Sequence, residues 1–271
     1  MDNALGDFLR ARRELVTPAE VGLPPGNGLR RVPGLRREEV AMLAGISIDY
    51  YLRLERGRDR SPSARVAGAL ASVLQLDEES TEYLMTLSGR AAQPAPARDE
   101  DLPPGLATLV RTLNVPCVVF NRYCDVLAAN PHARELAPFL RPGANLLRAI
   151  FLGGPEPLHR PEPAALTAGA VAHLRALCGT DTDDPRLHAL IGELSLKSTR
   201  FRRLWARHDV HRGGSGTIVI RHPHAGDLEL ETQKLIVAGA PGLEVLVLHA
   251  QPGSRSADAL AALHPTTIYV D

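Results

Sequence analysis

The pattern of apolar residues in this sequence changes at residues 89–105, GRAAQPAPARDEDLPPG. Before this stretch, apolar residues recur at spacings of three and four, which predicts helices. After it, alternating Val-rich segments occur between helical ones, which predicts strands mixed with helices. A run rich in Pro, Ala and Gly interrupts both periodicities, so we expect two domains joined by a linker at 89–103.

Length and composition allow two ordinary globular domains. The chain has 271 residues, of which 44% are hydrophobic and 23% charged, enough to bury two cores. Because 31 basic residues balance 31 acidic ones, a nucleic-acid site must come from local clustering of charge. No apolar run approaches the ~18 to 20 residues of a membrane span, and MDNALGDFLR lacks the apolar core of a signal peptide. We therefore expect a cytoplasmic protein.

The three cysteines, Cys117, Cys124 and Cys178, form no CxxC pair and are too few for a disulfide scaffold. They are predicted to be small apolar residues, because free cysteine is often buried.

Residues 1–88 predict an all-α domain of five short helices. The first helix carries Leu5, Phe8 and Leu9 on one face and should end before Pro18. After a Pro- and Gly-rich loop, four more segments show helical spacing: RREEVAMLAG, ISIDYYLRLERGR, SARVAGALASVLQL and DEESTEYLMTLSG.

Residues 36–58 have the spacing of a helix-turn-helix. The apolar positions expected to face a common core are Val40, Ala41, Ala44, Ile46, Tyr51 and Leu54. Gly45 permits the left-handed backbone of a tight turn, which costs other residues roughly 1 kcal/mol. Ser47 is predicted to cap the second helix, with its hydroxyl accepting the N–H near Tyr50.

A second helix lying in a major groove would present its exposed side chains to base edges. Arg53 suits guanine O6 and N7, Asp49 suits cytosine N4, and Ile48 suits a thymine methyl group. Arg36 and Arg37 open the first helix of the motif, where they suit a phosphate. An arginine stripe extends this site through Arg30, Arg31, Arg56, Arg58 and Arg60. The predicted DNA-binding residues are Arg36, Arg37, Ser47, Ile48, Asp49, Tyr50, Arg53 and Arg58.

The string EEVAMLAGISIDYYLRLERGR, with one helix before it and two after it, resembles the repressor-like helix-turn-helix of the XRE family. The resemblance implies that Arg37 touches phosphate and that Ile48, Asp49 and Arg53 read bases.

This chain departs from the family pattern at Ile48 and Asp49, where most members carry short polar residues. Glu55 and Gly57 match the family's glutamate and helix-ending glycine. The resemblance implies structural roles for both, with Glu55 anchoring a neighbouring turn and Gly57 terminating the helix.

Residues 104–255 predict an α+β domain. PCVVFNRYCDVLAAN reads as two short strands, PHARELAPFL as a helix, and residues 163–207 as mostly helical. The segments SGTIVIRHP, GDLELETQKLIVA and LEVLVLHA are separated by turn formers and predict a three-stranded antiparallel sheet. Residues 256–271 are expected to form a C-terminal tail.

A second resemblance covers nearly the whole chain. The insertion VGLPPGNGLRRVPGLRREEV and the segments LAAN, RFRRLWARHDV, HPHAGDLEL and QPGS resemble MmyB-type transcription regulators. The C-terminal half of that family is a PAS-like domain thought to bind fatty acids or similar small apolar molecules. The resemblance therefore implies a ligand-responsive regulator. We expect no cofactor other than a bound fatty acid or similar apolar effector. Ala129 replaces the aromatic residue that usually precedes the Asn of LAAN, so the pocket wall or the ligand should differ.

The residues themselves suggest an apolar interior between a sheet and the helices of residues 134–207. Its lining would be Phe139, Leu147, Phe151, Leu194, Phe201 and Trp205, although the same residues suit an ordinary core. A carboxylate ligand needs a cation, for which the candidates are Arg148, Arg200, Arg203, Arg207 and His208. Asn130 is a further candidate, although it and Asn145 also suit caps at helix starts. The predicted ligand-binding residues are Asn130, Phe139, Leu147, Arg148, Phe151, Phe201, Trp205 and His208.

Two other functions are also compatible with the sequence. A metal-dependent hydrolase could use His208, Asp209 and His211, but no HExxH or DxD spacing supports a metal site. The glycines of residues 213–216 favour a hairpin over a phosphate loop, and no catalytic residue is predicted. A protein-interaction module that does not bind DNA is the third possibility.

The function that we expect is a sequence-specific DNA-binding transcriptional regulator that senses a small apolar ligand and is not an enzyme. A single small module makes few DNA contacts, so we expect a homodimer on a pseudo-palindromic operator. No membrane partner is expected.

Overall fold

The computed structural model describes residues 3–24, 34–89, 102–153, 158–159, 163–178, 184–211 and 213–263. They form two compact units. The first unit draws on Met1–Gln93, Val171–His188 and Arg202–Arg212, and the second on Pro94–Ala170, Ala189–Phe201 and Gly213–Asp271. Within these described residues, no helix is long and apolar enough to cross a membrane.

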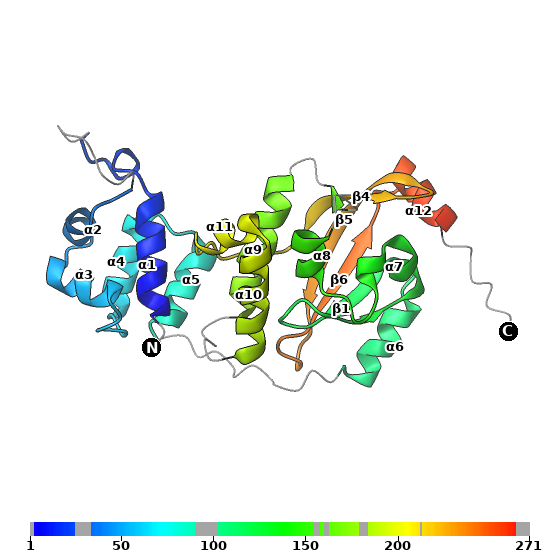
Figure 1. Ribbon diagram of the computed structural model, residues 1–271, viewed down its shortest axis with the longest axis horizontal. Helices are drawn as coiled ribbons and strands as arrows, with labels where there is room; N and C mark the ends of the chain where they lie inside the picture. The colour runs from blue at the N-terminus through cyan, green and yellow to red at the C-terminus, as the bar shows by residue number, and fades with distance from the viewer. Residues whose placement is uncertain are drawn as a thin grey trace. The chain divides into compact units, whose positions relative to one another are not determined.

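The five predicted helices of the N-terminal region are confirmed (Figure 1). They and a 3-10 turn, η1, are α1 (Ala4–Leu15), η1 (Ala19–Val21), α2 (Arg37–Leu43), α3 (Ile48–Glu55), α4 (Ala64–Val73) and α5 (Glu78–Leu87). Side chains of Asn3, Ser47, Ser63 and Asp77 accept backbone N–H groups at the starts of α1, α3, α4 and α5. These caps satisfy donors that a helix cannot pair internally, so the sequence sets the helix starts locally.

A buried apolar cluster holds these helices together. Helix α1 packs against α3 and α5, while α2 packs against α3 and α4. The cluster includes Leu5, Phe8, Leu9, Leu35, Val40, Ala41, Tyr51, Leu54, Ala67, Leu70, Leu74 and Leu84. The apolar periodicity of the sequence therefore identified the core side of the helix-turn-helix.

The second unit is built around an antiparallel sheet, as predicted for an α+β domain. Its strands are β1 (Cys117–Phe120), β2 (Val126–Ala129), β3 (Leu158–His159), β4 (Gly216–His222), β5 (Gly226–Ile236) and β6 (Glu244–His249). The spatial order is β2-β1-β6-β5-β4-β3, and β3 adds only two residues at one edge. Strands from the start and the end of this region therefore meet in the middle, where Val118 of β1 lies opposite Leu246 of β6.

Helices cover both faces of the sheet at β1. The remaining elements are α6 (Pro104–Thr112), α7 (Pro131–Leu136), η2 (Pro138–Leu140), α8 (Leu146–Leu152), α9 (Pro163–Cys178), α10 (Pro185–Lys197), α11 (Thr199–Trp205) and α12 (Arg255–Leu263). Val118 and Phe120 share a buried cluster with α7 and α12, whereas Cys117 and Val119 share one with α6. This split follows from the alternation of side chains along a strand.

Three expectations about the chain's layout can be compared with the structure. The tail expected from residue 256 begins instead with helix α12. Its Leu260 is buried in the same apolar cluster as Val118 and Phe120, called the sheet cluster below. Nearly all of the predicted linker lies outside the described residues, as do Arg30 and Arg31. Cys117 and Cys124 are buried free cysteines, as expected, and burial raises the pKa of Cys117 to about 11.

Candidate nucleic-acid interface and ligand-binding unit

The turn between α2 and α3 has the geometry that the sequence predicted. Gly45 has φ +66°, in the left-handed region that glycine adopts without a steric penalty. Ser47 Oγ accepts a hydrogen bond from the backbone N–H of Tyr50 at 3.2 Å. The turn and the cap together fix where α3 starts.

Helix α3 buries one face and exposes the other. Tyr51 and Leu54 are fully buried, whereas Asp49 and Arg53 are exposed and the Ile48 residue is 43% exposed. The three residues predicted to read bases therefore lie opposite the core. The Arg53 guanidinium lies 5.4 Å from the centroid of the Tyr50 ring, which restrains a long and otherwise mobile side chain.

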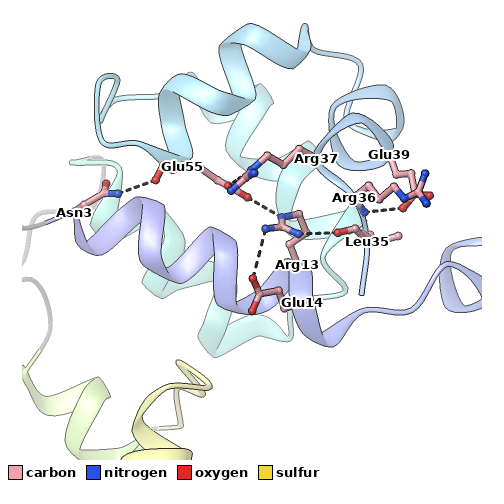
Figure 2. A network of polar contacts seen from close by, with 8 residues as sticks. All are labelled: Asn3, Arg13, Glu14, Leu35, Arg36, Arg37, Glu39 and Glu55. Carbon is pink, nitrogen blue, oxygen red and sulfur yellow. Dashed lines mark hydrogen bonds and ion pairs between the residues drawn. The ribbon is translucent and has the colours of Figure 1, made fainter. Parts of the chain in front are cut away.

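Behind this surface, a buried carboxylate joins three helices (Figure 2). Glu55 at the end of α3 accepts hydrogen bonds from Arg13 Nε of α1 at 2.7 Å and from Arg37 Nε of α2 at 2.5 Å. The Glu55 side chain is 1% exposed and that of Arg13 6%, whereas that of Arg37 is 44% exposed. Arg13 also donates to the carbonyl of Leu35, just before α2. The structural role implied for Glu55 is confirmed.

The pKa of Glu55 reflects opposing causes. Burial raises it, but hydrogen bonds from Arg37 and Arg13 outweigh burial, and the net pKa lies below its ordinary value. The carboxylate is therefore charged at neutral pH and keeps both arginines as partners. Sequence analysis did not identify Arg13, although its position four residues after Leu9 places it on the buried face of α1.

The other predicted phosphate-binding arginines are exposed near the two ends of the motif. The backbone N–H of Arg36 donates to Glu39 Oε2 at 2.7 Å, which caps α2 while the Arg36 side chain remains exposed. Arg58 is exposed just after α3, and its backbone N–H donates to the carbonyl of Arg53 at 2.9 Å. Since Arg37, next to Arg36, contacts Glu55 at the end of α3, and Arg58 follows that end directly, these positive charges gather toward the C-terminal end of α3.

Gly57 ends α3 as the resemblance implied. Its φ is +67°, and a Cβ added at this position would clash with the side chain of Asn3. The amide of Asn3 in turn donates to the carbonyl of Glu55 at 2.7 Å. The missing side chain thus lets the start of α1 approach the end of α3.

Five of the predicted ligand-binding residues lie among the helices of the second unit and have partners there. Leu147 and Phe201 are fully buried, and Phe151 meets the Phe201 ring edge-on with centroids 5.2 Å apart. Phe139 packs against the sheet cluster. Arg148 pairs with Glu193 at 2.8 Å.

Asn130 has a structural role in place of the predicted ligand contact. Its Oδ1 accepts N–H groups from Ala133 and Cys117, and its Nδ2 donates to the carbonyls of Leu113 and Val115. An amide offers two donors and two acceptor lone pairs, so all four are used. Asn145 likewise caps α8, by accepting the N–H of Arg148 at 2.9 Å.

Trp205 and His208 are assigned to a different unit from the other predicted ligand-binding residues. Both belong to the first unit, where the ring of His208 lies edge-on to Phe8 of α1. The interior that Trp205 was predicted to line with Phe139 and Leu147, with His208 as a candidate cation for the ligand, therefore draws on residues of both units. The chain turns sharply after α11, and His208 has φ +54°.

The side chains proposed for a metal-dependent hydrolase have separate partners. Asp209 pairs with Arg12 and Arg207, and His211 pairs with Glu79. Across the described parts of the chain, no group of three or more His, Cys, Asp or Glu side chains is arranged to hold a metal ion.

The geometry defines a class: a five-helix bundle that exposes the second helix of a helix-turn-helix, followed by an α+β unit with an antiparallel sheet. Comparison with family models agrees with this class. A helix-turn-helix domain model matches residues 4–84, and a model of the MmyB-like transcription regulator ligand binding domain matches residues 102–263. The chain belongs to the MmyB-like transcription regulators, and both resemblances drawn from the sequence are confirmed. A comparison with curated proteins gave no match.

Proposed function

We propose that this DNA-binding transcription regulator reads a specific operator with α3 and responds to a small apolar ligand in its C-terminal domain. The observation that carries the first part is the outward face of α3, where Ile48, Asp49 and Arg53 lie opposite the buried Tyr51 and Leu54. A short helix with a capped start and exposed early residues suits the major groove. We place the protein in the cytoplasm and assign no catalytic step to it.

Arg37 is proposed to hold a DNA phosphate. Its Nε is engaged by Glu55, which leaves Nη1 and Nη2 for two phosphate oxygens. A buried anion behind an exposed cation fixes the position of the cation without neutralising its outward charge. Phosphate contacts of this kind set the register of α3 in the groove.

DNA binding is tested by selecting duplexes from a random library with the full chain and measuring affinity by fluorescence anisotropy. We expect a recurrent sequence and a linear fall of log K with log salt, with a slope of about −0.9 per neutralised phosphate. Arg37→Ala should make this slope shallower by the contribution of about one neutralised phosphate. Arg111→Ala, which removes an exposed arginine of α6, is the matched control. Binding that is insensitive to salt and sequence would contradict the proposal.

A homodimer is proposed because one α3 offers only a few base contacts. Two reading helices should occupy half-sites roughly 34 Å apart or a multiple of that distance. Sedimentation of the selected duplex with the protein should give two chains per duplex. A saturated complex with one chain per duplex would refute the dimer and leave the reading helix in place.

The ligand is proposed to be fatty-acid-like. The family membership of residues 102–263 and the apolar packing of Leu147, Phe151 and Phe201 support this assignment. Denaturing mass spectrometry of solvent extracts should find a lipid in near-stoichiometric amount, compared with extracts of an unrelated protein purified in parallel. A co-purified polar molecule, or none above the control, would argue against an apolar ligand.

A further inference from the structure

Residues of the ligand-binding family region complete the core of the DNA-binding bundle. The segment Trp205–His211, called the strap below, begins at the last residue of α11 and contributes Val210 to the buried cluster of the bundle. Val210 is 6% exposed. The His208 ring meets Phe8 of α1 edge-on, with centroids 6.5 Å apart. The strap is therefore packed against the same apolar surface that organises α1 to α5.

An ion pair ties the strap to α1. Arg12 Nη1 lies 2.7 Å from Asp209 Oδ1, and the two side chains are 17% and 26% exposed. Arg207 binds the second oxygen of Asp209 at 2.8 Å. Partial burial protects the Arg12 pair from full screening, so it stabilises the docked strap more than a surface pair would.

The strap is also held by the C-terminal half of α9. The Arg175 guanidinium lies 3.9 Å from the centroid of the Trp205 ring and donates to the carbonyl of Trp205. Arg175 Nη1 lies 3.1 Å from Nδ1 of His208, and since arginine can only donate, Nδ1 accepts. The backbone N–H of His211 donates to the carbonyl of Ala172.

Helices of the ligand-binding region contribute residues to both units. Helix α9 places Pro163–Ala170 in the second unit and Val171–Cys178 in the first. Helix α11 divides in the same way after Phe201. The family model of the ligand-binding domain spans both helices and the strap. The second unit is thus joined to the strap through the backbone of helix α11, and to the residues that hold the strap through the backbone of helix α9.

Helix α1 connects the strap to the reading helix. Two consecutive residues of α1 make this connection. Arg12 pairs with Asp209 of the strap, and Arg13 pairs with Glu55 at the end of α3. Glu55 in turn holds Arg37, the proposed phosphate contact. One rigid helix therefore supports both the strap and the DNA-binding surface.

We propose that the strap is the coupling element of this regulator, held by the Arg12–Asp209 pair. When docked, it keeps α1 in the position that supports α3 and Arg37; when released, it weakens DNA binding. The inference rests on the proposed DNA-binding function and adds the route by which the ligand-binding region acts on it. Coupling between sites is reciprocal, so DNA must also favour the docked strap.

Trp205 provides a built-in reporter for the test, because it is the only tryptophan of the chain. The full chain is compared with Asp209→Arg, which places a third cation beside Arg12 and Arg207. The matched control is Asp227→Arg, which makes the same charge change in the exposed pair with Arg221 on the β4–β5 hairpin. A double variant, Arg12→Asp with Asp209→Arg, restores an ion pair of reversed polarity.

Three quantities are measured with the duplex selected by the wild-type chain: the Kd, the active fraction from a stoichiometric titration, and the Trp205 emission wavelength. We expect Asp209→Arg to shift Trp205 emission to longer wavelength and to raise the Kd about fivefold or more at an unchanged active fraction. A rise in the Kd is informative because the added positive charge would by itself strengthen DNA binding and lower the Kd. The double variant should recover the wild-type Kd and Trp205 emission wavelength, and Asp227→Arg should change neither quantity.

Reciprocity supplies a readout that a purely structural role would not move. Saturating duplex should shift the Trp205 emission of Asp209→Arg back toward that of the wild-type chain. An unchanged Kd in Asp209→Arg overturns the coupling, as does unchanged Trp205 emission, because the pair would then not hold the strap. The coupling is also overturned if the double variant does not recover the wild-type Kd and Trp205 emission. Failure of the wild-type chain to bind any selected duplex would instead contradict the proposed function.

Discussion

The buried carboxylate of Glu55 pairs with the half-exposed guanidinium of Arg37, with 2.5 Å between Oε2 and Nε. The last residue of α3 thereby holds the first residue of α2. Since Arg13 occupies the other carboxylate oxygen, a single anion aligns the two helices of the motif with α1.

Glu55→Gln should lower the free energy of unfolding by about 3 kcal/mol or more. Loss of the buried carboxylate leaves the buried charge of Arg13 to the more distant and exposed carboxylate of Glu14, 3.6 Å away. Urea unfolding followed by circular dichroism measures the change. Glu38→Gln, at an exposed position of α2, is the control and should stay within about 0.5 kcal/mol of the wild-type chain. Equal stability of the two variants would show that the pair does not support the fold.

Arg53→Ala should relax the preference at one base pair of the operator by about 1–3 kcal/mol, because it removes the guanidinium proposed to bind guanine with two hydrogen bonds. Repeating the duplex selection with the variant measures this change. Arg65→Ala, which removes an exposed arginine of α4, should leave the selected sequence unchanged. An unchanged preference in Arg53→Ala would contradict the assignment of α3 as the reading helix.

Gly57→Ala should destabilise the bundle more than Gly45→Ala. Both glycines have left-handed backbones, which cost an alanine roughly 1 kcal/mol. The added methyl group meets open space at Gly45 but the side chain of Asn3 at Gly57. Thermal unfolding of the two variants measures the difference directly. Equal melting temperatures would mean that α1 gives way to the methyl group at no cost.

Stability should fall as the pH is lowered from 7 to 5, because His208 is buried in its neutral form. Burial, with Arg175 and Arg12 nearby, lowers its pKa from 6.5 to about 3. Between these values the unfolded chain binds a proton that the folded chain excludes. The contribution of neutral His208 to the free energy of unfolding is therefore fully present above pH 6.5 and is lost toward pH 3. The free energy of unfolding changes by up to about 1.4 kcal/mol per pH unit in this range.

His208→Gln should flatten this dependence, whereas His188→Gln, at an exposed position of α10, should keep it. Urea midpoints at pH 5, 6 and 7 provide the comparison. A wild-type slope that survives in His208→Gln would assign the proton uptake to another group.

Asn130→Asp should destabilise the second unit by about 1–3 kcal/mol, because the carbonyls of Leu113 and Val115 lose their donors. Asn114→Asp makes the same change at an exposed position nearby and should be neutral. Urea unfolding measures stability, and solvent extraction measures any co-purified small molecule. Loss of that molecule at unchanged stability would restore Asn130 as a ligand contact.

Local signals were sufficient for much of this fold. Capping residues such as Ser47 and turn glycines such as Gly45 act through hydrogen bonds and backbone freedom within a few residues. Period-2 alternation likewise located β1 and the β4–β5–β6 meander. The tail expected after residue 255 was wrong in part, because α12 packs its Leu260 on the sheet.

The amino-acid sequence alone was enough to predict the helix-turn-helix, the outward residues of α3 and the α+β nature of the second region. These properties depend on periodicity and on short-range hydrogen bonds. Three contacts could be found only in the folded chain: Arg13 and Arg37 share Glu55, the amide of Asn130 is fully used, and His208 and Asp209 pack on α1. Each of these contacts joins side chains that are distant in the chain. Their partners are chosen by burial, because a buried charge or polar group must be matched by whichever group the packed core brings beside it.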